Sequence, residues 1–184
     1  MNWNVITTEY LFQQPPYFVA RKDVCKRPDG VIIPAYYVVE LPASVITFGI
    51  TEDEQVLFTE QYRHPIGEVS LELPGGFIET GEEPVTAAQR ETEEETGYQF
   101  SNYFYIGTVA GNPGILNNRT HLFVATGGKK VTEQQMDDQE DITVTLLSIN
   151  KVIHLMEERK IIQSLHLNAC FYAMLHLNKL KFLQ

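Results

Sequence analysis

Residues that favour β-strands are concentrated in the first half of the chain, in short stretches separated by turn-forming residues. These stretches are rich in Val, Ile, Tyr and Phe, and Arg27-Pro28-Asp29-Gly30 is typical of a turn between two of them. Such a pattern predicts β-hairpins. The expected strands are residues 19–24, 31–40, 45–50, 55–62 and a short alternating piece at 71–73.

A helix is predicted for residues 83–96, because Pro84 is tolerated in a first helical turn and Gly97 is favourable just after a helix end. Further strands are expected at residues 103–109, 120–125 and 142–147, and further helices at 150–159 and 164–182. The side chains through which the last helix is expected to pack on a sheet are Leu167, Phe171, Met174 and Leu175.

Strands in hairpins that are interrupted by helices predict an α/β fold, more narrowly α+β, in which a mixed sheet is sandwiched between helices. Residues 1–43 contain no predicted helix and are expected to form a separate antiparallel β extension before the main domain, residues 44–184. A chain of 184 residues can bury a core in such a domain without disulfide bonds or structural metal.

The formal net charge of −10 argues against general binding to nucleic acid, because phosphate contacts need clustered Lys and Arg. Cys25 and Cys170 lie far apart, so neither a disulfide framework nor a zinc site is indicated. No signal-peptide pattern is present, and the longest uncharged run, residues 161–178, is too polar for a membrane span. We therefore expect a cytoplasmic protein without nucleic-acid or membrane partners, able to bind a small anion where cations screen its charge.

Three glutamates crowd one side of the predicted helix when its residues are placed 100° apart. Glu91, Glu94 and Glu95 lie together, with Arg90 beside them and able to pair with Glu94, while Glu93 points elsewhere. Like charges three and four residues apart repel by roughly 0.2–0.5 kcal/mol per pair, and the second half of a helix disfavours anions. A hard cation such as Mg²⁺, which prefers oxygen ligands, would reverse that penalty. The face expected to pack holds Val85, Ala88, Gln89, Thr92 and Thr96.

The glutamates alone are compatible with a solvated acidic helix face, but their spacing is more specific. Residues 76–98 match G-x5-E-x7-R-E-U-x-E-E-x-G-U, where U is a bulky apolar residue, and such a match is expected by chance on the order of 10⁻⁶ times per chain. The segment therefore resembles the signature of the Nudix family, with one departure, Thr92 at the first U. The matching residues are Gly76, Glu82, Arg90, Glu91, Glu94, Glu95 and Gly97.

The resemblance extends, at lower specificity, to the ADP-ribose pyrophosphatase branch of that family. Gln61-Tyr62-Arg63 is similar to the QYR segment of the branch, and residues 71–76 are similar to its ELPAG segment, with Gly75 where Ala is usual. A backbone ligand needs no side chain, so this change is tolerable. The metal ligands that the resemblance implies are the Gly75 carbonyl, Glu91, Glu95 and, assisting them, Glu94, with Glu82 close by.

An acidic segment downstream supplies a candidate catalytic base. Asp137-Asp138-Gln139-Glu140-Asp141 is similar to the loop that such enzymes close over the diphosphate, which implies Glu140 as the catalytic glutamate and Asp138 as the second choice. An ordinary acidic loop before a strand is the alternative. The remaining catalytic candidates are Glu94 and Arg90, and the candidate substrate-binding residues are Arg63, Gln61 and Arg119, unless the two arginines are structural.

The resemblance implies Mg²⁺-dependent hydrolysis, with Mn²⁺ as a substitute, of the diphosphate in a nucleoside diphosphate sugar. ADP-ribose is the expected substrate, and AMP and ribose 5-phosphate are the expected products. GDP-mannose, ADP-glucose or a nucleoside triphosphate would fit the same signature, which identifies neither base nor sugar. A domain that binds nucleotide without cleaving it is a further alternative, but it would be expected to lose one of the helix glutamates. The branch also implies a homodimer in which residues 1–43 contact the partner and the substrate.

Overall fold

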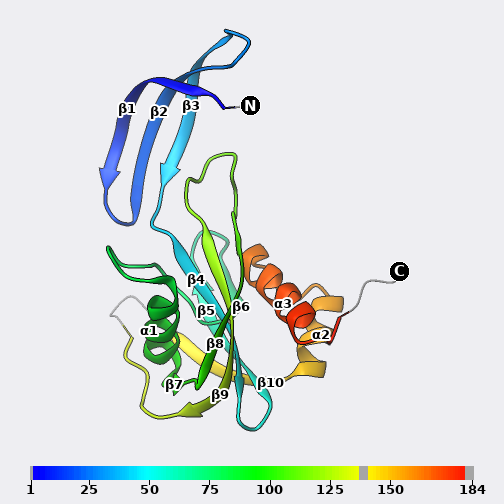
Figure 1. Cartoon of the computed structure of the whole chain (residues 1–184). Helices are drawn as coiled ribbons and strands as arrows, with labels where there is room; N and C mark the ends of the chain where they lie inside the picture. Colours follow the sequence, from blue (N-terminus) through cyan, green and yellow to red (C-terminus); the bar gives the residue numbers. More distant parts are fainter. Residues whose placement is uncertain (1, 137–140, 181–184) are drawn as a thin grey trace. The chain divides into compact units, whose positions relative to one another are not determined.

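The structure is a computed structural model that describes residues 2–136 and 141–180. Two compact units make up the chain (Figure 1). One unit comprises Met1–Ala43 and Ala110–Arg119, and the other comprises Ser44–Val109 and Thr120–Gln184. The chain therefore leaves the first unit after Ala43 and returns to it once, between two strands of the second unit.

The described strands of the first unit form an antiparallel sheet in the order β1-β2-β3. Its strands are β1 (Asn4–Gln14), β2 (Phe18–Lys26) and β3 (Ile32–Glu40). The predicted strand character of the first forty residues is confirmed, but the sequence pattern did not single out β1. Every residue of β1 is exposed, so this strand lacks the inside–outside alternation on which such a prediction depends.

Residues 110–119 run beside the end of β3 and belong to the first unit. The Val39 amide donates to the Ile115 carbonyl at 2.9 Å, and the Asn117 amide donates back to the Val39 carbonyl at 3.3 Å. The Asn117 side-chain oxygen also accepts from the Leu41 amide at 3.0 Å. This segment, which the sequence pattern placed within residues 44–184, is thus folded against the N-terminal sheet.

A mixed sheet forms the centre of the second unit, and its main path among the described residues runs β10-β5-β4-β9-β7. β4 and β9 are parallel, while β6 pairs with β5 and β8 with β9 in antiparallel fashion. The strands are β4 (Ser44–Thr51), β5 (Gln55–Arg63), β6 (Glu68–Glu72), β7 (Tyr98–Gln99), β8 (Asn102–Val109), β9 (Thr120–Lys130) and β10 (Ile142–Ser148).

Helices cover both faces of this sheet (Figure 1). On one face α1 (Pro84–Thr96) packs through Ala87 and Ala88 against Val45 and Phe123. On the other face α2 (Ile149–Glu157) and α3 (Ser164–His176) share a larger core with residues such as Phe48. Successive residues of a strand point to opposite faces, which is why neighbouring β4 residues serve different cores. The predicted fold class, a mixed sheet between helices with an N-terminal antiparallel extension, is confirmed.

The last helix ends earlier, and packs through a different face, than the sequence pattern predicted. α3 stops at His176 because Asn178 adopts a left-handed conformation with φ of 55°, and the Lys179 amide then caps the Met174 carbonyl at 2.9 Å. Leu167 is exposed, and Phe171 and Leu175 are only partly buried; of the four predicted contacts, only Met174 is fully buried. The small side chains of this helix bring it close to the sheet. Its buried residues are His166, Ala169, Cys170, Ala173 and Met174.

Within residues 2–136 and 141–180, no helix combines the length and the apolar character that crossing a bilayer requires.

Candidate active site

Helix α1 has the limits that its sequence predicts, within one residue. Pro84 occupies the first turn, and Gly97 follows the last turn with φ of 75°, its amide donating to the Glu93 carbonyl at 2.7 Å. A side chain at Gly97 would also place Cβ 2.2 Å from the Thr132 carbonyl oxygen, so glycine is required there for space as well as for conformation. The end of the glutamate-bearing helix is therefore fixed.

The buried face of α1 differs in part from the predicted one. Ala88, Thr92 and Thr96 are buried as expected, but Val85 and Gln89 are exposed. Ala87 and Glu95 are buried in their place, so the helix is rotated to bring Glu95 toward the sheet. Thr92, the departure from the Nudix signature, is fully buried, and its hydroxyl donates to the Ala88 carbonyl at 2.6 Å. The polar atom introduced by threonine is thereby satisfied within the helix.

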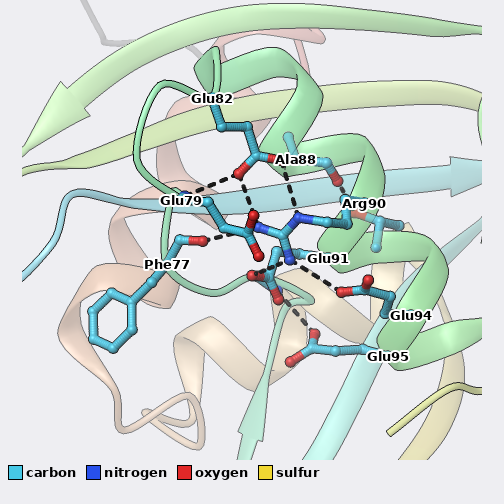
Figure 2. Close-up of polar contacts among 10 residues, drawn as sticks. Phe77, Glu79, Glu82, Ala88, Arg90, Glu91, Glu94 and Glu95 are labelled. Carbon is cyan, nitrogen blue, oxygen red and sulfur yellow. Dashed lines mark hydrogen bonds and ion pairs between the residues drawn. The ribbon is translucent and has the colours of Figure 1, made fainter. Parts of the chain in front are cut away.

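Arg90 links the glutamates of the helix to the loop before it (Figure 2). Its guanidinium donates to both carboxylate oxygens of Glu82 at 3.0 Å, to Glu91 at 2.8 Å and to Glu94 at 3.0 Å. It also donates to the Phe77 carbonyl at 3.0 Å. The hydrogen bonds from Arg90 lower the pKa of Glu82, and those with Glu82 raise the pKa of Arg90. The predicted pair between Arg90 and Glu94 is present. The positive charge of Arg90 offsets the repulsion among the carboxylates that it binds, which are those of Glu82, Glu91 and Glu94.

The backbone at Gly75 and Gly76 lies directly against the helix carboxylates. The Gly75 amide donates to the Glu95 carboxylate at 2.9 Å, and a Cβ on Gly76 would lie 2.4 Å from a carboxylate oxygen of Glu91. A Cβ on Gly75 would lie 2.1 Å from the Val45 carbonyl oxygen. Glycine at position 75, where the branch usually has alanine, is therefore a steric requirement in this chain rather than a neutral change.

The carbonyl of Gly75 is directed away from strand β4. The Thr47 and Val45 amides of β4 donate to the Pro74 and Gly76 carbonyls, each at 2.9 Å. Successive carbonyls of an extended segment point in opposite directions, so the intervening Gly75 carbonyl points to the opposite side. This orientation suits the predicted role of Gly75 as a backbone ligand.

The chemistry of these donors fits a hard divalent cation. All the candidate ligand atoms are oxygens, from the carboxylates of Glu91, Glu94 and Glu95 and from the Gly75 carbonyl. Mg²⁺ and Mn²⁺ bind to oxygen ligands, whereas zinc sites are commonly built from sulfur and imidazole ligands. In the part of the chain that the structure describes, no three acidic, His or Cys side chains are already grouped closely enough to hold an ion. Arg90 holds two of these carboxylates and the Gly75 amide holds the third.

The other predicted site residues are distributed over both units. Gln61 and Arg63 lie on β5, and Gln61 is half-buried between β10 and β6. Arg119 is exposed and belongs to the first unit. Glu140 and its alternative Asp138 lie outside the described residues.

The segments on either side of that predicted catalytic loop are tied to each other and to α1. The Gln134 side-chain amide donates to the Glu95 carbonyl at 2.7 Å and to the Ile142 carbonyl at 2.9 Å. The Gln135 amide donates to the Glu94 carbonyl at 2.8 Å. The chain on both sides of residues 137–140 is therefore anchored close to the C-terminal turn of the glutamate-bearing helix.

Sequence reasoning missed a buried partner of Arg63. The Arg63 guanidinium makes two hydrogen bonds, at 2.9 and 2.6 Å, to the Glu72 carboxylate, whose side chain is only 2% exposed, and His166 lies 3.2 Å from the same carboxylate. Burial alone would raise the pKa of Glu72, but the hydrogen bonds from Arg63 and His166 hold it well below its usual range. The sequence signal was Glu72 itself, a charged residue between two leucines of a strand, which needs a partner once it is buried.

A mixed sheet between helices, with the glutamate-bearing helix α1 set against a glycine segment, is the arrangement of a Nudix-type protein. The chain belongs to the Nudix family: the model of the NUDIX domain matches residues 40–165. A second model, of the nucleoside diphosphate sugar hydrolase N-terminal domain, matches residues 3–39. The resemblance inferred from the signature is thereby confirmed.

Three relatives are 30–35% identical to this chain over the aligned residues. The methanol dehydrogenase activator of Bacillus methanolicus is 33% identical over 69% of this chain and 69% of its own length. The ADP-ribose pyrophosphatase of Bacillus subtilis is 30% identical over 67% of this chain and 68% of its own. The ADP-sugar pyrophosphatase of Mus musculus is 35% identical over 65% of this chain and 57% of its own.

A solved structure supports the fold over nearly the whole chain. The crystal structure of an ADP compounds hydrolase superposes with a TM-score of 0.83 over 97% of this chain and 96% of that one, at 17% sequence identity. At this identity the likeness shows the fold alone.

Proposed function

We propose that the protein hydrolyses the diphosphate of a nucleoside diphosphate sugar, with ADP-ribose as preferred substrate and AMP and ribose 5-phosphate as products. The observation that carries the proposal is the convergence of Glu91, Glu94 and Glu95 with Arg90 and the Gly75 backbone. Those acids have no structural need to be adjacent, and a signature with one of them missing would favour binding without cleavage. The names of the Bacillus subtilis and mouse relatives support this substrate class.

The residues of the site have distinct proposed tasks. Glu91, Glu95 and the Gly75 carbonyl hold the cation, Glu94 assists, and Arg90 keeps the carboxylates in place. Divalent metal is a general requirement of the family, and Mg²⁺, with Mn²⁺ as a substitute, suits the oxygen-only donors. When bound, the metal neutralises charge that grows on the diphosphate and makes a water more acidic.

Glu140 is the proposed base that orients this water or removes its proton. The water oxygen bonds to one phosphorus, and the bond between that phosphorus and the bridging oxygen breaks. The other phosphate leaves with the bridging oxygen, so that one product is AMP and the other is ribose 5-phosphate. Gln61, Arg63 and Arg119 remain the proposed substrate contacts.

A substrate panel tests the proposed function directly. The purified protein is incubated with ADP-ribose, ADP-glucose, GDP-mannose, NADH, diadenosine polyphosphates and dGTP, with Mg²⁺ or with EDTA, and kcat/KM is compared. ADP-ribose is expected to have the highest value, and EDTA is expected to stop the reaction because the carboxylates then lack their cation. A lead by GDP-mannose or ADP-glucose would preserve the chemistry and correct the substrate. Binding of a nucleotide without cleavage of any compound would contradict the proposal and favour a nucleotide sensor.

We further infer that the protein is a homodimer formed through the first unit, and that residues 1–43 of this unit also reach the substrate of the partner. All of β1 is exposed, and a three-stranded sheet this open leaves apolar side chains in water. Such a surface is typical of an interface. The exposed large apolar residues of this unit are Trp3, Val5, Ile6, Tyr10, Leu11, Phe12, Tyr17, Phe18, Val31, Ile32, Tyr36, Tyr37 and Ile115.

Charged residues on β1 are expected to dissociate the dimer. Light scattering should give the wild-type protein twice the 21.0 kDa mass of the chain, and Val5→Lys with Leu11→Lys should reduce it to that of a single chain. Burying two ammonium groups without partners is unfavourable, whereas both residues are exposed in the single chain, so its fold should persist. Val69→Lys is the matched control, since Val69 is 62% exposed but lies in the second unit. A monomeric wild type would contradict the inference.

A further inference from the structure

His166 connects α3 to the segment that carries Gly75. The imidazole is almost fully buried, with 6% of its side chain exposed, and its Nδ1 accepts a hydrogen bond from the Leu73 amide at 2.9 Å. Its Nε2 lies 3.2 Å from a carboxylate oxygen of Glu72. One ring therefore contacts two consecutive residues at the point where β6 ends and the glycine segment begins.

The two contacts determine which nitrogen of the His166 ring carries the proton. Nδ1 faces an N–H donor and must present its lone pair, so in the neutral ring the proton lies on Nε2. Nε2–H then donates to Glu72, whose other hydrogen bonds come from Arg63. A proton on Nδ1 would face the Leu73 N–H and break that bond. His166 thus acts as a neutral bridge between a backbone amide and a buried carboxylate.

This bridge holds the residues immediately before the proposed metal ligand. Pro74 has no amide proton, so the Leu73 amide is the last backbone donor before that of Gly75. The Leu73 amide is bound by His166 from α3, and the Gly75 amide is bound by Glu95 from α1. Those two helices lie on opposite faces of the sheet (Figure 1).

We propose that His166 is a positioning residue for the metal site: by holding the Leu73 amide and the Glu72 carboxylate, it sets the backbone that presents the Gly75 carbonyl beside Glu95. The inference rests on the proposed function, because it takes Gly75 as a ligand. Groups that orient metal ligands without touching the metal commonly change metal affinity by about 10–100-fold when they are removed.

Binding of Mn²⁺ to the metal-free protein, followed by electron paramagnetic resonance without substrate, tests the proposal. His166→Phe fills the ring space but removes both hydrogen bonds, and it is expected to weaken Mn²⁺ binding by about 10–100-fold. His166→Asn retains an acceptor for the Leu73 amide and should recover part of the loss. Met174→Ala is the matched control, because Met174 is equally buried on α3 and its side chain lies in the large core beside Leu73, but it makes neither of the two hydrogen bonds of His166. It should lower thermal stability and leave Mn²⁺ affinity unchanged.

Equal Mn²⁺ affinity in the wild-type protein and His166→Phe would overturn the proposal, and so would an equal loss in Met174→Ala. Long-range ¹H–¹⁵N spectra of the wild-type protein supply a readout that needs no variant. An unprotonated Nδ1 on His166, together with slow exchange of the Leu73 amide, is expected, and a protonated Nδ1 would contradict the bridge. Failure of the proposed function has a different signature, since it would leave the wild-type protein able to bind Mn²⁺ but unable to hydrolyse any substrate of the panel.

Discussion

Replacing Glu95 with glutamine is expected to reduce turnover of ADP-ribose by on the order of 10³-fold or more, while the protein stays folded. The Glu95 side chain is buried, and it accepts a hydrogen bond from the Gly75 amide at 2.9 Å. The amide oxygen of glutamine can accept that bond as well, so the local structure should persist. The negative charge that attracts the cation is lost, however. Steady-state kinetics with Mg²⁺, together with circular dichroism, separates these two effects.

Glu93→Gln provides a control on the same helix. Glu93 points away from the other glutamates and accepts a hydrogen bond from the Gln99 side chain at 2.9 Å. The substitution removes one negative charge two residues from Glu95, so it reproduces the general change in helix charge without touching the donor set. Turnover near the wild-type value is expected. If Glu95→Gln were also within a few-fold of wild type, the assignment of Glu95 as a metal ligand would be wrong.

Glu140→Gln is expected to slow hydrolysis by at least about 10²-fold, the lower end of the effect of removing a general base. The cation and the substrate should still bind, because neither Glu91 nor Glu95 is altered. The loss should therefore fall on kcat, with KM and Mn²⁺ affinity close to their wild-type values. That division distinguishes a base from a metal ligand, whose removal would weaken Mn²⁺ binding too.

Asp138→Asn is the matched comparison for this second prediction. Asp138 lies in the same acidic segment and loses the same charge, but it is the second choice for the base. We expect it to retain most of the wild-type rate. A normal rate in Glu140→Gln with a large loss in Asp138→Asn would transfer the role to Asp138. Normal rates in both would assign proton removal to a glutamate of the helix.

The features of the site that could be predicted are those encoded by spacing within one helix. Glu91, Glu94 and Glu95 share a side because a helix advances 100° per residue, and Arg90 reaches Glu94 because residues four apart are neighbours. The family signature added the glycine segment, which no periodicity would have placed against the helix. Glu95 was expected on the acidic side, but its burial depends on how α1 is rotated on the sheet, and periodicity alone did not fix that rotation.

Contacts between distant parts of the chain were the ones that sequence reasoning missed. His166 binds the Leu73 amide across 93 residues, and in the sequence this histidine resembles any other residue of an apolar helix. Residues 110–119 join the first unit through backbone hydrogen bonds, which carry no side-chain signal. β1 escaped recognition for a different reason, because every one of its residues is exposed and the strand therefore lacks an alternation of buried and exposed positions.

Which residue can occupy position 75 depends on how closely the backbone of strand β4 approaches it. A methyl group there would lie 2.1 Å from the Val45 carbonyl oxygen, whereas ordinary contact begins at 3.4 Å. A homologue with alanine at this position must therefore have a different local backbone, either at this residue or in β4, and since the Val45 amide binds Gly76, a shift of β4 would also move the glycine segment. Alanine and glycine here belong to two different local backbones. An evolving lineage, or a protein engineer, would have to change the local backbone and the residue together.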